Sequence, residues 1–65
     1  MKVKDILKHI EDLKLYIEFI DLQSGASYGF FTKNDLIYNT KHHNDKIKKL
    51  NVQYINNKRT LILYI

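Results

Sequence analysis

The stretch LILYI at residues 61–65 is apolar at every position. Successive side chains of a strand point to opposite faces of its sheet, so both faces of this strand need cover. The preceding LNVQY at residues 50–54 alternates apolar and polar side chains, and NNKR at residues 56–59 suits a tight turn that tolerates positive φ. Residues 50–65 therefore predict a hairpin with Tyr54 opposite Leu61.

A second apolar hairpin is predicted earlier in the chain. Residues 15–22 (LYIEFIDL) and 27–33 (SYGFFTK) are rich in β-branched and aromatic side chains, and QSGA between them signals a turn. If Ser24 and Gly25 form the centre of that turn, Phe19 lies opposite Phe30. Phe30 then shares one face of the sheet with Phe19, and Phe31 lies on the other face.

The N-terminal segment, residues 2–13, has the periodicity of an amphipathic helix. Its apolar side chains recur at helical spacing, at Val3, Ile6, Leu7, Ile10 and Leu13. In residues 34–47 we expect a single helical turn that holds Leu36 and Ile37 and then a polar loop, with a second short helix over residues 44–50 as the less favoured alternative. The chain thus predicts a single α+β domain over residues 1–65, in which an N-terminal amphipathic helix packs on a four-stranded, mostly antiparallel sheet built from two hairpins.

Composition excludes several classes of protein. The 65 residues contain no cysteine, which rules out disulfides and thiolate metal sites. No apolar segment approaches the roughly 20 residues that span a membrane, and the first eight residues lack the apolar run of a signal peptide. We therefore expect a soluble cytoplasmic protein that does not enter a membrane.

No catalytic or metal-binding motif stands out. Glu18 and Asp21 are three residues apart on one predicted strand and so point to opposite faces, which prevents them from acting as an acid–base pair. His42, His43 and Asp45 form the only cluster that resembles metal ligands, but adjacent side chains diverge, and we expect solvated loop histidines there. The sequence predicts no enzyme activity, no cofactor and no metal site.

The predicted sheet has more apolar side chains than one helix covers. Burying even four of them would contribute about 1.5–3 kcal/mol each, which is comparable to the whole stability of a small domain. We therefore predict a homodimer, or binding to a protein target, through the far face of the sheet or by edge pairing of a strand. The predicted protein-binding residues are Tyr16, Ile20, Phe31, Ile62 and Tyr64.

The net charge of +4 is unevenly placed. Residues 1–21 carry four Lys against five acidic residues, a net of −1, whereas residues 22–65 carry seven Lys or Arg against two acidic residues, a net of +5. Such asymmetry favours an alternative function in nucleic-acid binding, although lysines also protect sheet edges. The residues predicted for that alternative are Lys46, Lys48, Lys49, Lys58 and Arg59. A third alternative places a small ligand, such as a nucleotide, between two subunits.

The order of the apolar segments resembles a family type. VKDIL at residues 3–7, LYI at 15–17, LNV at 50–52 and TLILYI at 60–65 resemble the short accessory proteins that phages and mobile elements of low-GC bacteria encode. The resemblance implies a place in the cytoplasm of the bacterial host, and some proteins of that type inhibit host defence systems. It favours a non-enzymatic protein that occludes or sequesters a host target.

Overall fold

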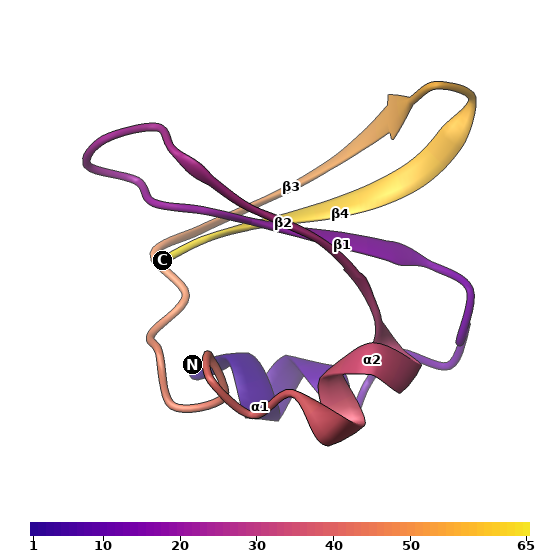
Figure 1. The fold of residues 1–65 in the computed structure, drawn as a ribbon, viewed down its shortest axis with the longest axis horizontal. Coiled ribbons are helices and arrows are strands. Elements are labelled where there is room, and N and C mark those ends of the chain that lie inside the picture. The colour runs from indigo at the N-terminus through magenta and orange to yellow at the C-terminus, as the bar shows by residue number, and fades with distance from the viewer.

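A four-stranded sheet with two short helices against one face makes up the computed structural model, which describes all 65 residues (Figure 1). The elements in chain order are α1 (Val3–Leu7), β1 (Tyr16–Ile20), β2 (Ser27–Thr32), α2 (Lys33–Tyr38), β3 (Lys49–Ile55) and β4 (Lys58–Tyr64). This confirms the α+β class and the two hairpins.

The strands lie in the order β2-β1-β4-β3, and the two central strands, β1 and β4, run parallel. The sheet is therefore mixed, and the prediction of a mostly antiparallel sheet is wrong. The central positions follow from composition, because the middle of β1 and the second half of β4 are buried at consecutive positions. Strands whose side chains are buried on both faces belong inside a sheet. The more polar strands β2 and β3 form its edges.

The N-terminal helix is shorter than predicted, because only Val3–Leu7 is helical and residues 8–15 form turns and irregular backbone. The Asp12 side chain accepts a hydrogen bond from the Lys14 N–H (2.9 Å), a local bond that competes with helical pairing. The Ile10 carbonyl accepts a bond from the Lys33 ammonium (2.6 Å). Ile10 still reaches the core, but Leu13 is 56% exposed, so the predicted apolar stripe ends before Leu13.

Helix α2 begins with a capping box. The Asp35 N–H donates to Thr32 Oγ1 (3.2 Å), while the Thr32 N–H donates to Asp35 Oδ2 (2.9 Å). Leu36 then enters the core at 1% exposure. The loop after α2 closes over the start of α1, where the Val3 N–H donates to the Asp45 carbonyl (3.0 Å) and satisfies one of the free donors of that helix.

A β-bulge in the first hairpin reverses the predicted faces of β2. Phe19 lies opposite Gly29 and the next residue of β1 lies opposite Ser27, so Tyr28 is an extra residue on β2. Gly29 adopts φ 111°, a backbone conformation that side chains disfavour. Because one added residue changes which side chains share a face, Phe31 lies on the helix-covered face and Phe30 lies on the other. The prediction that Phe31 belongs to the far face is wrong.

The second hairpin keeps its predicted faces in a different register. Asn56 and Asn57 both have positive φ (52° and 62°) and form the two-residue turn, one position earlier than predicted. Leu61 therefore lies opposite Val52 instead of Tyr54. Each residue of β4 therefore pairs with the residue of β3 that lies two positions before the predicted one. Because side chains alternate between the faces with a period of two, every residue stays on its predicted face.

The core lies between the helices and the sheet. Its buried residues come from both helices, from the turn after α1 and from the two central strands: Val3, Leu7, Ile10, Ile17, Phe19, Leu36, Leu61 and Leu63. The helices do not cover β3, so its apolar side chains on this side remain exposed, including Leu50 and Val52 at 46% each. Neither helix is long and apolar enough to cross a membrane.

The two edge strands use their own side chains to occupy backbone donors. On β3, the Val52 N–H donates to Oδ1 of the neighbouring Asn51 (2.9 Å). On β2, the last residue, Thr32, donates its N–H to the capping carboxylate of Asp35. An edge donor that is already bonded is less available to an added strand, so both edges are partly protected.

Candidate functional site

The face of the sheet away from the helices carries no other element, and we call it the open face (Figure 1). The register places on it the side chains that pair across the four strands on this side. From β1, β2 and β4 these are Tyr16, Glu18, Ile20, Ser27, Phe30, Thr32, Lys58, Thr60, Ile62 and Tyr64. Four of the five predicted protein-binding residues therefore lie on this face, and Phe30 takes the place of Phe31.

The side chains of the open face differ widely in exposure. Ile62 is only 3% exposed, because its neighbours on the same face cover it. Tyr16, Ile20 and Tyr64 are partly buried, and Phe30, at 51% exposure, is the most accessible aromatic ring on the face. The accessible part of the open face therefore consists mainly of aromatic side chains near its borders. The aliphatic side chain near its centre, Ile62, is buried.

Two lysines lie on tyrosine rings at opposite ends of the open face. The Lys58 ammonium lies 4.8 Å from the centre of the Tyr16 ring and donates to its hydroxyl (3.1 Å). The Lys49 ammonium lies 5.3 Å from the centre of the Tyr64 ring. Both pairs are cation–π contacts, in which the quadrupole of the ring attracts the ammonium group. The open face therefore combines aromatic rings with positive charge.

A carboxylate lies in the middle of the same face. Glu18, on β1 between Phe30 and Ile62 of the neighbouring strands, is 9% exposed and accepts a hydrogen bond from the Ser27 hydroxyl (2.8 Å). Asp21 lies beyond β1 in the hairpin loop, where it accepts bonds from Ser24 and Gln23. The two carboxylates therefore have separate hydrogen-bond partners.

The five cations predicted for nucleic-acid binding do not form one patch. Lys49 lies at the start of β3 opposite Tyr64, whereas Lys58 and Arg59 begin β4 after the hairpin turn. Lys46 and Lys48 precede β3 on the Lys49 side, and the seven residues of β3 separate the two groups. The structure therefore divides the predicted set between opposite ends of the second hairpin.

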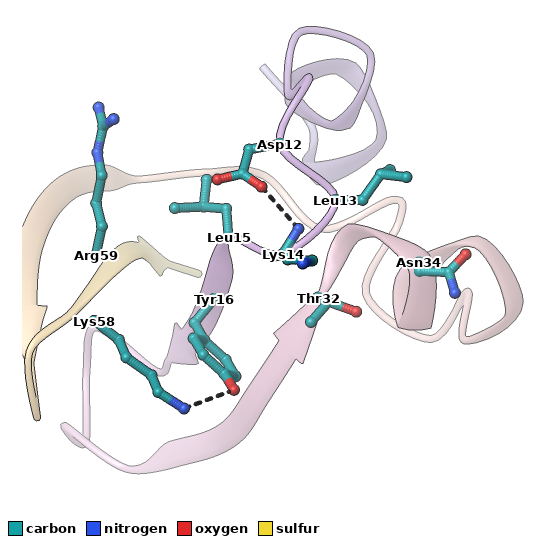
Figure 2. Close-up of a pocket in the computed structure, with 9 residues that line it drawn as sticks. All are labelled: Asp12, Leu13, Lys14, Leu15, Tyr16, Thr32, Asn34, Lys58 and Arg59. Atoms are coloured by element: carbon teal, nitrogen blue, oxygen red, sulfur yellow. Dashed lines mark hydrogen bonds between the residues drawn. The ribbon is translucent and has the colours of Figure 1, made fainter.

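At the end of the sheet where β1 and β4 begin, the surface contains a hollow of about 690 Å³, which we call the end groove (Figure 2). Three cations, Lys14, Lys58 and Arg59, line it beside a single carboxylate, Asp12. Figure 2 shows Lys58 extended to the Tyr16 hydroxyl and Arg59 extended in the opposite direction. The other lining residues are Leu13, Leu15, Tyr16, Thr32 and Asn34.

Sequence reasoning did not find the end groove. Lys14 comes from the turn before β1, Thr32 ends β2 and Asn34 belongs to the first turn of α2. The pairing of β1 with β2 brings these three residues together. Lys58 and Arg59 join them because β1 and β4 lie side by side and parallel, which places the first residues of both strands at the same end. No local motif signals such a meeting, and the parallel pairing was itself not predicted.

His42 is buried, contrary to the expectation of a solvated loop histidine. It is 8% exposed, and its ring lies 5.1 Å from the ring centres of both Phe19 and Tyr28. Its Nδ1 lies 2.8 Å from Oδ2 of Asp45. The loop between α2 and β3 thus contributes a packing residue to the core. No three His, Asp or Glu side chains come together as ligands for a metal ion.

Two carboxylates have lowered pKa values. The backbone N–H of Lys2 donates to Asp5 (3.0 Å) and holds the pKa of that carboxyl below its ordinary 3.8. The Ser24 hydroxyl, at 2.7 Å, and the Gln23 N–H lower the pKa of Asp21 in the same way. Asp5 caps the start of α1, Asp21 stabilises the turn of the first hairpin, and neither carboxylate lines the end groove.

Comparison with known proteins adds no family assignment. No protein-family model, no curated protein and no solved structure matches the chain. The open face and the end groove are the two features of the chain that bear on its function.

Proposed function

We propose that this chain is a small binding protein, not an enzyme, and that it associates with a second copy through the open face. The paired protein would occlude or sequester a protein target. Its resemblance to accessory proteins of phages and mobile elements supports a target in the cytoplasm of a bacterial host. The observation that carries the proposal is the sheet face that no helix covers, where Tyr16, Ile20, Phe30 and Tyr64 are partly or half exposed.

The edges of the sheet support a face-to-face pairing over edge pairing. Backbone donors of both edge strands, at Thr32 and Val52, are already bonded to side chains of the same chain. An added strand would have to displace these bonds, whereas a partner on the open face displaces none of them. Of the two modes predicted from the sequence, the structure favours the open face.

The area that a stable protein interface requires is comparable to one face of this molecule. A stable protein interface takes about 800 Å² from each partner. The accessible surface of this chain is 4625 Å², so the interface would occupy roughly a sixth of it. One face of a box-shaped molecule supplies about that share. Only 12 of the 65 residues are buried in the single chain, so a second copy would add substantially to a small core.

Analytical ultracentrifugation of the purified chain over a range of micromolar concentrations tests the proposal. We expect a dimer that dissociates on dilution, and we expect Phe30→Glu or Tyr64→Glu to yield a monomer, because each change places a charge within the interface. Tyr54→Glu is a matched control, since Tyr54 is 78% exposed on the helix side of β3. A wild-type protein that stays monomeric throughout the range would contradict self-association.

A further inference from the structure

The end groove continues onto the open face. A second hollow of about 290 Å³ lies on that face, and its lining includes Phe30, Asn56 and Thr60. Tyr16 and Lys58 line both hollows, so the two join along the contact between these side chains. The two hollows therefore adjoin around the end of the sheet, and we call them together the channel.

The cations in this channel have little local compensation. Lys58 and Arg59 have no carboxylate partner within ion-pair distance, and the only ion pair of the chain joins His42 to Asp45. The one carboxylate of the end groove, Asp12, accepts its hydrogen bond from the Lys14 backbone N–H instead of an ammonium group. Three cations against one carboxylate make the channel attractive to a polyanion.

The aromatic rings are spaced for separated bases. Tyr16 lies opposite Thr32, two residues along β2 from Phe30, so the two aromatic residues are diagonal neighbours on the open face. Diagonal neighbours in an antiparallel pair lie about 7–8 Å apart. Bases stacked in a duplex are only about 3.4 Å apart along a strand. Two rings at the larger spacing suit successive bases of an unstacked strand, one on each ring.

We propose that this channel binds single-stranded nucleic acid, with one base on Phe30, a second base that displaces the Lys58 ammonium from the Tyr16 ring, and phosphates beside Lys14, Lys58 and Arg59. Amide groups of Asn34 and Asn56 lie in the two hollows, within the lining that base edges would meet. A duplex fits this arrangement poorly, because its bases are not free to stack on side chains. RNA and DNA both offer bases and phosphates to these side chains, and the experiment below distinguishes the two.

This inference goes beyond self-association and does not depend on it. Tyr16 and Phe30 belong to both the channel and the open face, so a bound strand and a second copy of the chain would exclude each other. Tyr64 lies at the opposite end of β4 from Lys58. Variants at Tyr64 therefore test pairing, and variants at Lys58 and Arg59 test the channel.

Fluorescence anisotropy with labelled oligo(U), oligo(dT) and a duplex of equal length, about ten nucleotides each, tests the proposal. Because a single strand releases about 0.7 counterion per phosphate contact, three cations predict a slope of log affinity against log salt of about −2. Lys58→Gln with Arg59→Gln should reduce the slope to about −0.7. Phe30→Ala should weaken binding about tenfold at unchanged slope, because it removes stacking and no charge.

The double variant Lys46→Gln with Lys48→Gln is the matched control, because it removes the same amount of charge at the opposite end of β3. It should leave the slope unchanged. Thermal unfolding of each variant checks its fold, and the single change Arg59→Gln replaces the double variant if that one unfolds. Tighter binding of oligo(U) or oligo(dT) than of the duplex supports the proposal, and their ratio identifies the sugar. Equal binding of the duplex, an equal effect of the control variant, or no binding at low salt would overturn it.

Discussion

Replacing Phe30 and Phe31 separately by alanine tests the bulge that decides the faces of β2. Phe31 packs on the core with its ring centre 5.6 Å from that of Phe19, whereas Phe30 is 51% exposed on the open face. Truncating a fully buried Phe costs about 3–5 kcal/mol. Since Phe31 is partly buried, we expect Phe31→Ala to cost about 2–3 kcal/mol, including the lost aromatic contact. Phe30→Ala should cost less than about 1 kcal/mol.

These differences are large for a chain of this length. A domain of 65 residues has a free energy of unfolding of about 3–10 kcal/mol, so Phe31→Ala would remove a substantial part of it. Each kcal/mol corresponds to about 4–8 °C in Tm for a small domain, which predicts a decrease of about 10–20 °C for Phe31→Ala.

Urea unfolding followed by circular dichroism measures both variants, at a protein concentration where ultracentrifugation shows only the monomer. That condition keeps any effect of Phe30 on self-association out of the comparison. A larger loss for Phe30→Ala than for Phe31→Ala would refute the bulged register. That result would instead support the unbulged hairpin that the sequence alone predicts.

Three further changes test other contacts. His42→Ala should cost about 2–4 kcal/mol in urea unfolding because it leaves a cavity among aromatic rings. His42→Phe refills that space and should cost less than about 1.5 kcal/mol. Equal losses for the two variants would contradict a packing role. The pKa values of Asp5 and Asp21 are lowered in the folded state, so the stability that these carboxylates contribute is present at neutral pH and is lost as the pH falls below 3.8 through the lowered pKa values. The decrease of Tm with acid should therefore be shallower in Asp21→Asn, and an unchanged acid profile would argue against the turn that it stabilises. Asn57 has φ 62°, so Asn57→Ala should cost about 1 kcal/mol in urea unfolding and Asn57→Gly should be nearly neutral; equal effects of the two would contradict the left-handed turn.

The two hairpins show how far local sequence determines a sheet. The predicted second hairpin was displaced by two residues, and its faces were nevertheless correct, because the side-chain period is two. The first hairpin contains an unpredicted bulge at Tyr28, and one extra residue was enough to exchange Phe30 and Phe31. Alternating composition therefore identifies strands more securely than it identifies which face a residue occupies.

Long-range contacts account for the remaining errors. The parallel pairing of β1 with β4 joins segments more than forty residues apart, and no local signal specifies it. The burial of His42 depends on a loop that is polar in composition but is tied to α1 by backbone hydrogen bonds. For the same reason the end groove, formed where β1, β2, α2 and β4 meet, has no signature in any one stretch of sequence.

The bonded donor at Val52 on the edge of β3 has a consequence for how copies of this chain can assemble. A sheet that recruits strands at its edge exposes a new edge each time, so growth of that kind is open-ended and leads to fibres. Pairing of one face with an identical face uses up both surfaces and stops at two. By hindering the first mode, Asn51 would direct the proposed self-association toward a closed assembly of fixed size, and Asn51→Val should increase the tendency to form fibrils.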